Sequence, residues 1–139
     1  MTKRLTIKEA EYLAHSLAKY QMSWDEPIPD FGTRYPGKLE GTLSAVYQTY
    51  GKKDLYPTFT DKASNLFYLI IKNHPFLNGN KRIAVTSLLT FMYLNKKWID
   101  VENEVLYEMA VWVAKSNPQV KNGVVLAIKE FISKNQTAL

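Results

Sequence analysis

The sequence predicts an all-α protein in which roughly six helices pack around a buried central helix. Apolar residues recur at helical spacing along almost the whole chain. The run 83–95 carries no charge and is apolar nearly all round, as expected of a buried helix. The length of 139 residues, of which 46% are hydrophobic and 22% charged, fits one compact domain over 1–139. The one candidate for a β-hairpin, a short flap, is the loop Phe31–Tyr35.

The first predicted helix begins at a capping box, Thr6-Ile7-Lys8-Glu9, which precedes an apolar stripe. The stripe comprises Ala10, Leu13, Ala14 and Leu17. An irregular loop follows from Trp24 to Gly32, because two prolines this close together do not fit inside a helix. Its acidic residues, Asp25, Glu26 and Asp30, are expected to form a solvated surface and not a metal cluster.

The second and third predicted helices precede the central one. Pro36 suits the first turn of the second helix, and Gly51 is expected to end it. The apolar stripe between them comprises Leu39, Leu43, Val46, Tyr47 and Tyr50. Thr60 is the expected N-cap of the third helix, which continues through the apolar run 66–71.

The central helix and two further helices complete the chain. The central helix begins near Asn80, and residues 98–101 are expected to form a short extended connector after it. The fifth helix is marked by Val105, Leu106, Met109, Ala110 and Val113. Asn117-Pro118 ends it, and the sixth helix spans the apolar positions 124–132.

The composition excludes several classes of site. The chain has no cysteine, which excludes disulfides, thiolate nucleophiles and zinc–thiolate sites. No apolar run reaches the roughly 18 residues that a membrane span needs. The N-terminal segment lacks the apolar core of a secretory signal, so the protein is expected to stay in the cytoplasm.

The distribution of charge indicates an anion site. The net charge is +5, and no acidic residue occurs between Lys62 and Ile99. The basic residues of this stretch are Lys62, Lys72, Lys81, Arg82, Lys96 and Lys97. Such a field attracts phosphates or an acidic partner. Only three of the 18 basic residues are arginine, which favours a compact anion site over a nucleic-acid interface.

The segment 73–82 joins two apolar helices and carries groups that move protons or bind anions. His74 is a candidate general base, because imidazole accepts a proton near neutral pH. Pro75 stops the preceding helix, and Phe76 is expected to plug into the core and hold the loop rigid. Gly79 can adopt a positive φ and leaves room for a ligand.

The start of the central helix is the expected anion site. Asn80, Lys81 and Arg82 open it, and the free N–H groups of a helix N-terminus bind phosphate. Cations at this end cost a helix about 0.3–1 kcal/mol, so two of them suggest an anion that balances their charge. The alternative is an ordinary turn in which His74 caps the preceding helix and the basic pair is merely solvated.

The motif His-Pro-Phe-Leu-Asn-Gly-Asn-Lys-Arg, residues 74–82, resembles the signature of the Fic/Doc superfamily. Lys81 is similar to the death-on-curing (Doc) toxin branch, because most Fic adenylyltransferases have glycine there. The resemblance is strongest over residues 30–130. It includes Gly32-Thr33-Arg34, Pro36-Gly37-Lys38-Leu39-Glu40, Leu55-Tyr56-Pro57, Lys62-Ala63 and Asn95 through Val101.

The resemblance implies a role for each residue of the motif. His74 would deprotonate a hydroxyl of a target protein, and Gly79 and Asn80 would hold the phosphates of ATP. Arg82 would pair with phosphate in a bidentate fork, and Lys81 would add a point charge. Arg34 lies in the region that forms a target-docking flap in the family.

The expected activity depends on the branch of the superfamily and on the positions at which this sequence differs from the family motif. Doc-type toxins are kinases that move the γ-phosphate of ATP to a threonine of elongation factor Tu, whereas Fic relatives transfer the nucleotidyl group. Asn78 stands where the family usually has an acidic residue that helps to bind Mg²⁺, and an amide oxygen should bind the ion more weakly. Val85 stands where many adenylyltransferases have a second arginine.

Four readings follow from these departures. A Doc-like toxin leads, and the alternatives are a Fic-type nucleotidyltransferase and a catalytically impaired binding protein with Asn78 as the lesion. Nucleic-acid binding is the weakest of the four. The self-inhibitory pattern Ser/Thr-x-x-x-Glu followed by Gly or Asn is absent from the sequence, so we expect an antitoxin protein to act in trans. His15 is expected to have a structural or surface role.

Overall fold

The computed structural model describes residues 2–21 and 28–139, and the helical fold class is confirmed. Within these residues the first helix is continuous and consists of α1 (Ile7–Glu9), the π-helical η1 (Ala10–His15) and α2 (Ser16–Gln21). Five more helices follow: α3 (Lys38–Ala45), α4 (Phe59–Asn73), α5 (Asn80–Leu94), α6 (Asn103–Lys115) and α7 (Lys121–Asn135). None of the helices in the described part of the chain is long and apolar enough to cross a membrane.

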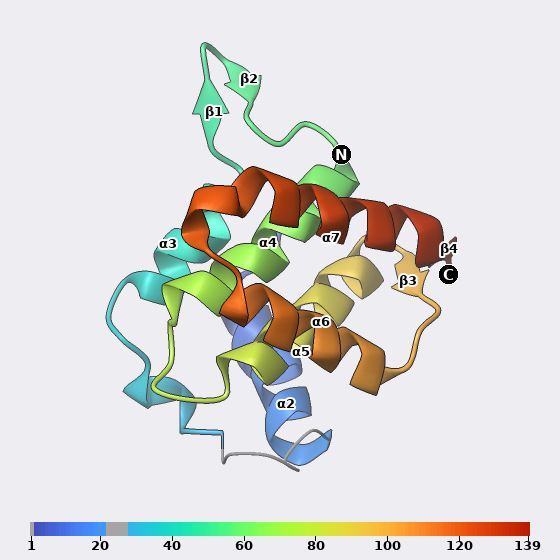
Figure 1. Ribbon diagram of the computed structural model, residues 1–139. Coiled ribbons are helices and arrows are strands. Elements are labelled where there is room, and N and C mark those ends of the chain that lie inside the picture. Colours follow the sequence, from blue (N-terminus) through green and yellow to red (C-terminus); the bar gives the residue numbers. More distant parts are fainter. Residues whose placement is uncertain (1, 22–27) are drawn as a thin grey trace.

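The buried central helix is α5. It packs against α4, η1, α6 and β3, and α7 crosses the outer side of α4 (Figure 1). Nearly all of its residues from Asn80 to Met92 are buried, which accounts for the absence of charge in the run 83–95. Thr86 illustrates the packing, because its hydroxyl donates to the carbonyl oxygen of Ala14 at 2.7 Å and so joins α5 to the first helix.

The N-cap of helix α4 lies two residues before the expected one. Thr58, and not Thr60, is its N-cap: the Thr58 hydroxyl accepts from the Asp61 amide at 3.0 Å, and the Asp61 carboxylate accepts from the Thr58 amide at 3.2 Å. The spacing of three residues to an acidic partner decides between the two threonines. Burial alone raises the pKa of Asp61, but hydrogen bonds from Lys129 and Thr58 outweigh it and hold that pKa below its usual value.

The hairpin lies elsewhere than expected. Residues Phe31–Thr33 form a 3₁₀ turn, η2, whereas the antiparallel pair β1 (Thr49–Tyr50) and β2 (Lys53–Asp54) projects from the helical body (Figure 1). Helix α3 therefore ends at Ala45, and Gly51 and Lys52, both with positive φ, form the tip of the hairpin. Positive φ at both central residues gives the turn the twist that a two-residue hairpin needs.

A second strand pair closes the C-terminal end. The connector after α5 contains β3 (Lys97–Ile99), which pairs with β4 (Gln136–Ala138) at the end of the chain. Asn117-Pro118 separates α6 from α7 as expected, with a 3₁₀ turn, η3 (Pro118–Val120), between them. After this turn the chain returns to α4: α6 packs against α5 and α4, and α7 packs against α4.

Candidate functional site

The six residues between α4 and α5 form the candidate site. His74 caps the end of α4 in the left-handed conformation, with φ 48° and ψ 64°, and its side chain is exposed. A residue other than glycine adopts this conformation only when the surroundings enforce it, and such strain is common at functional sites. Pro75 follows at once and prevents the helix from continuing. The end of α4 therefore presents an imidazole ring to solvent.

The Asn80 side chain holds the turn together. Its Oδ1 accepts from the backbone amide of Phe76 at 3.0 Å, and its Nδ2 donates to the carbonyl oxygen of Phe76 at 2.8 Å. These two bonds fix the orientation of the amide group. Nδ2 also lies 3.5 Å from Nδ1 of His74, a distance at the limit of a hydrogen bond. Asn80 thus shapes the loop from inside, and its expected contact with phosphate stays a prediction.

Phe76 anchors the loop in the core. Its side chain is only 1% exposed, and its ring lies 5.6 Å from that of His15 and 5.8 Å from that of Phe31. Leu77, the next residue, points outward and is 72% exposed. The loop is therefore fixed to the core through Phe76 and exposed to solvent at Leu77.

Gly79 precedes α5 in a left-handed conformation that favours glycine. Its φ is 77°, and a Cβ atom at this position would lie 2.5 Å from Cδ1 of Ile28. The backbone angle therefore disfavours a side chain, and a Cβ atom would also force the end of the Ile28 side chain to shift. Ile28 belongs to the segment that precedes η2, so the first half of the chain covers the inner face of the loop.

The two cations at the start of α5 differ in their surroundings. Lys81 is half-buried, whereas the Arg82 side chain is 1% exposed and ranks among the largest fully buried side chains of the described residues. A phosphate would have to reach below the surface to meet Arg82. The predicted bidentate contact of this arginine with phosphate stays a prediction.

Arg34 lies near the motif although the two are far apart in the sequence. The backbone amide of Tyr35 donates to the carbonyl oxygen of Pro75 at 2.9 Å, which places the segment after η2 beside the loop. The Arg34 guanidinium donates to the carbonyl oxygen of Phe31 at 3.2 Å and to Glu40 at 3.0 Å, and it lies 4.3 Å from the centre of the Phe31 ring. Hydrogen bonds from its own backbone and from Arg34 hold the pKa of Glu40 below its usual value.

Among the residues that the structure describes, no group of three or more histidine, aspartate or glutamate side chains could hold a metal ion. Asn78 is half-exposed and offers only an amide oxygen. Asp30 is exposed and forms an ion pair with Lys19 at 3.3 Å, as expected of a solvated acidic loop. Asp25 and Glu26 lie outside the described residues. The described residues therefore supply no cluster of side chains that would hold a metal ion without help from a bound phosphate.

His15 has the structural role that the sequence allowed, but its place was not foreseen. It is the last residue of η1, is 6% exposed, and its Nε2 lies 2.8 Å from the carbonyl oxygen of Pro29. Because a carbonyl oxygen only accepts, the ring proton lies on Nε2. Its ring contacts that of Phe31 edge-on at 5.3 Å. The position of His15 next to the apolar stripe of the first helix is the sequence signal that could have predicted its burial.

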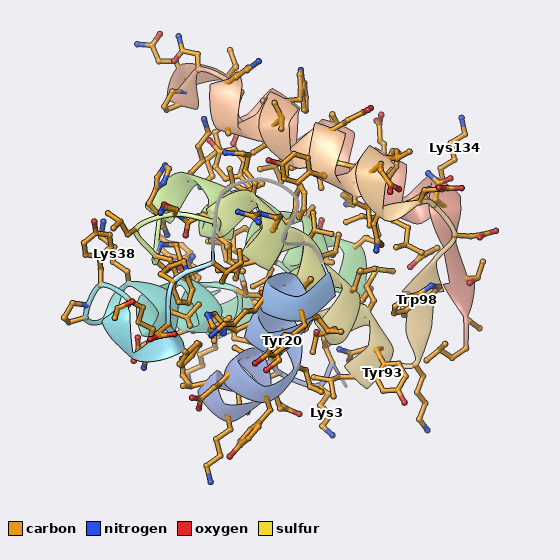
Figure 2. The ribbon with its side chains drawn as sticks, turned by 90° about the horizontal axis from the view of Figure 1, so that it is seen from below. Lys3, Tyr20, Lys38, Tyr93, Trp98 and Lys134 are labelled. Atoms are coloured by element: carbon orange, nitrogen blue, oxygen red, sulfur yellow. The ribbon has the colours of Figure 1, made fainter. Side chains whose placement is uncertain are left out.

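Two surface cavities lie outside the turn 74–79, and the second borders the residue before it. One, of about 500 Å³, is lined mostly by apolar residues of the first helix and α5, and Tyr93 and Trp98 lie side by side at it (Figure 2). The other, of about 430 Å³, lies between α3 and the end of α4 and is lined by Lys38 and Lys72. Asn73, the residue before His74, also lines this second cavity.

Comparison with known proteins agrees with the motif. The model of the Fic/DOC family matches residues 5–92, which is more than half of the chain. The chain belongs to the Fic/DOC family. The Toxin Doc protein of Mycolicibacterium smegmatis is 34% identical over 59 residues, which are 42% of this chain and 45% of that relative. The chain thus matches less than half the length of this family relative. No solved structure matches.

The conformation of Gly79 can be tested by the stability of a substituted protein. We expect Gly79→Ala to lower the free energy of unfolding by about 1–3 kcal/mol, because the new methyl group meets Ile28 at a backbone angle that alanine disfavours. Gly41→Ala is the matched control. It lies inside α3 with no atom within 4 Å of a Cβ, so alanine should stabilise the protein by about 0.5–1 kcal/mol. Urea unfolding measures both, and equal effects of the two substitutions would contradict the assignment of strain to Gly79.

Proposed function

We propose that this Fic/DOC chain is a Doc-like toxin that transfers the γ-phosphate of ATP to a hydroxyl of a cytosolic protein, by resemblance elongation factor Tu. One observation carries the proposal: an exposed histidine at the end of α4 lies across a short turn from the N-terminus of α5, which begins with two cations and no acid. The name of the mycobacterial relative, Toxin Doc, supports the toxin class. Transfer of this phosphate to a translation factor would block translation.

His74 would supply the base. A target hydroxyl beside the exposed imidazole would give up its proton to the ring as its oxygen attacks the γ-phosphorus. The bond from the γ-phosphorus to the bridging oxygen would break, and ADP would leave. Phosphoryl transfer of this kind depends mainly on position and on neutralising charge. The backbone dipole of α5 and the half-buried Lys81 would neutralise that charge.

The kinase reading is favoured over transfer of a nucleotidyl group by two positions. Lys81 is similar to the Doc branch, and Val85 stands where many adenylyltransferases have an arginine. Val85 is fully buried in the face of α5 that packs into the core, so no charge is supplied from that position. A Fic-type nucleotidyltransferase is the alternative that the same scaffold supports.

A magnesium ion, when bound with ATP, would neutralise phosphate charge and help to align the transferred group. The described side chains offer no acidic cluster for it. Asn78 is the observation that favours a second candidate function, a catalytically impaired binding protein of the same fold. In that case the loop would still bind a partner or nucleotide without turnover.

An antitoxin protein is the proposed partner. The relative bears the name of a toxin, and the sequence of this chain lacks the self-inhibitory pattern Ser/Thr-x-x-x-Glu followed by Gly or Asn. We expect expression of this chain alone in a growing bacterium to stop growth, and expression of His74→Ala at the same level to be tolerated. Normal growth with wild-type protein that is present, folded and active on ATP would argue against restraint by a partner.

The reaction can be assigned with ATP labelled separately at the α- and γ-phosphates. We expect a bacterial lysate with Mg²⁺ to receive label from the γ position only, and His74→Ala to reduce the rate by about 10²- to 10⁴-fold, because the base is lost. Leu126→Ala is the control, since this side chain is 53% exposed on α7 and lies outside the loop, and its rate should equal that of the wild-type protein. Label from the α position would replace the kinase with a nucleotidyltransferase, and label from neither would favour the binding protein.

The role of Asn78 can be tested by restoring the acid. If weak metal binding limits activity, Asn78→Asp should raise the rate of transfer and lower the Mg²⁺ concentration needed for half the maximal rate, because carboxylate oxygens bind Mg²⁺ better than an amide does. Asn73→Asp is a control on the other side of His74, where the side chain donates to the hydroxyl of Thr42. A titration with Mg²⁺ measures both. An Asn78→Asp protein with unchanged magnesium dependence would exclude this position from metal binding.

A further inference from the structure

The segment Ile28–Phe31, called the strap below, lies against the inner side of the loop that precedes α5. Ile28 makes the closest approach: its Cδ1 lies 2.5 Å, and its Cα and Cγ1 3.7 Å, from the place where a Cβ of Gly79 would be. The three nearest atoms to that place all belong to Ile28. The Ile28 side chain is itself buried, with 8% exposed. An apolar side chain therefore closes the face of the one glycine that begins α5.

The strap is fastened to the first helix and to the loop. His15 donates from Nε2 to the carbonyl oxygen of Pro29 at 2.8 Å, and the Phe31 ring packs against the rings of His15 and Phe76. A few residues further on, Tyr35 donates its amide to Pro75 at 2.9 Å. The strap thus ends in a segment that is hydrogen-bonded to the same loop that Ile28 covers.

This arrangement conflicts with the chemistry of the loop. A phosphate at a helix N-terminus needs polar contact with backbone N–H groups. An isoleucine side chain provides no donor and excludes both water and anions from the surface that it covers. Gly79 and Asn80 are buried, whereas His74 and Leu77 are exposed. The outer half of the loop is accessible, and the inner half is covered by the chain itself.

We propose that the strap is a built-in restraint on the anion loop: the Ile28 side chain must leave Gly79 before the phosphates of a nucleotide reach the start of α5. This inference rests on the proposed function. It places the chain in an equilibrium between a closed form, favoured by burial of Ile28, and an open form that binds nucleotide. The apparent dissociation constant for ATP then equals the intrinsic constant divided by the fraction of open chains.

Binding of ATP to the full chain tests the restraint. By isothermal titration calorimetry, we expect Ile28→Ala to bind ATP on the order of tenfold more tightly than the wild-type protein, because less apolar surface holds the strap closed. Ile128→Ala is the matched control, since this isoleucine of α7 is also buried and lies outside the site. Its affinity should equal that of the wild-type protein.

The outcomes separate this inference from the proposed function. If the wild-type protein binds ATP and Ile28→Ala binds no more tightly, the restraint is overturned and the function stands. If Ile28→Ala binds ATP and the wild-type protein does not, the restraint is supported. If neither protein binds ATP, both proposals fall. A gain in affinity shared by Ile128→Ala would overturn the restraint, because it would trace to general loosening of the fold.

Thiol labelling reports the position of the strap without any reliance on catalysis. The sequence contains no cysteine, so Ile28→Cys introduces a single thiol. We expect a thiol-reactive dye to modify it slowly in the free protein and several-fold faster with saturating ATP, whereas Ile128→Cys should react slowly in both states. Fast labelling of Ile28→Cys without ATP, or a rate that ATP leaves unchanged or lowers, would overturn the proposal.

Discussion

The two hydrogen bonds between the Asn80 amide and the backbone of Phe76 are the interaction on which the site depends. They satisfy a donor and an acceptor that are buried with the Phe76 ring, and an unpaired buried group of this kind costs about 1–3 kcal/mol. They also tie the first residue of α5 to the middle of the turn. The position of His74 at one end of the loop and of Gly79 at the other follows from this closure.

The loop is the place where local rules are broken, and the rest of α4 and α5 obeys them. Helix α4 begins with a complete capping box, whose acid is also paired with Lys129 at 2.7 Å. Helix α5 begins with a glycine, no side-chain cap and two cations at its positive end. His74 adds a left-handed residue that is not glycine. These costs gather within a few residues, directly after a helix that has a complete capping box, as expected around a functional site.

The helices could be predicted because their signals are local. Periodic apolar residues located every long helix, the Thr6–Glu9 box was read correctly, and the uncharged run identified α5 as the buried helix. The errors arose where the deciding contact is distant or the signal is ambiguous. The hairpin at residues 49–54 has Gly51-Lys52 at its tip, and lysine is a poor marker of a positive φ. The pairing of β3 with β4 joins segments that are far apart in the sequence, so no window around residue 98 contains it.

The candidate site also has a part that the sequence predicts and a part that it does not. The motif residues could be picked out from their order along the chain, but not the contacts that Arg34, His15 and Ile28 make around them. Those contacts come from the first third of the chain and turn an open loop into a half-covered one.

Partner and strap would restrain a toxin in different ways. An antitoxin acts by mass action, so its effect disappears when the partner is degraded or diluted. The strap belongs to the same molecule as the loop, so it reduces the binding-competent fraction by a constant factor at any protein concentration. A constant factor cannot switch a toxin on and off, but it sets how much nucleotide affinity the free protein has. On the proposed function, the strap would therefore set the activity of the free toxin, and the partner would decide when that activity is expressed.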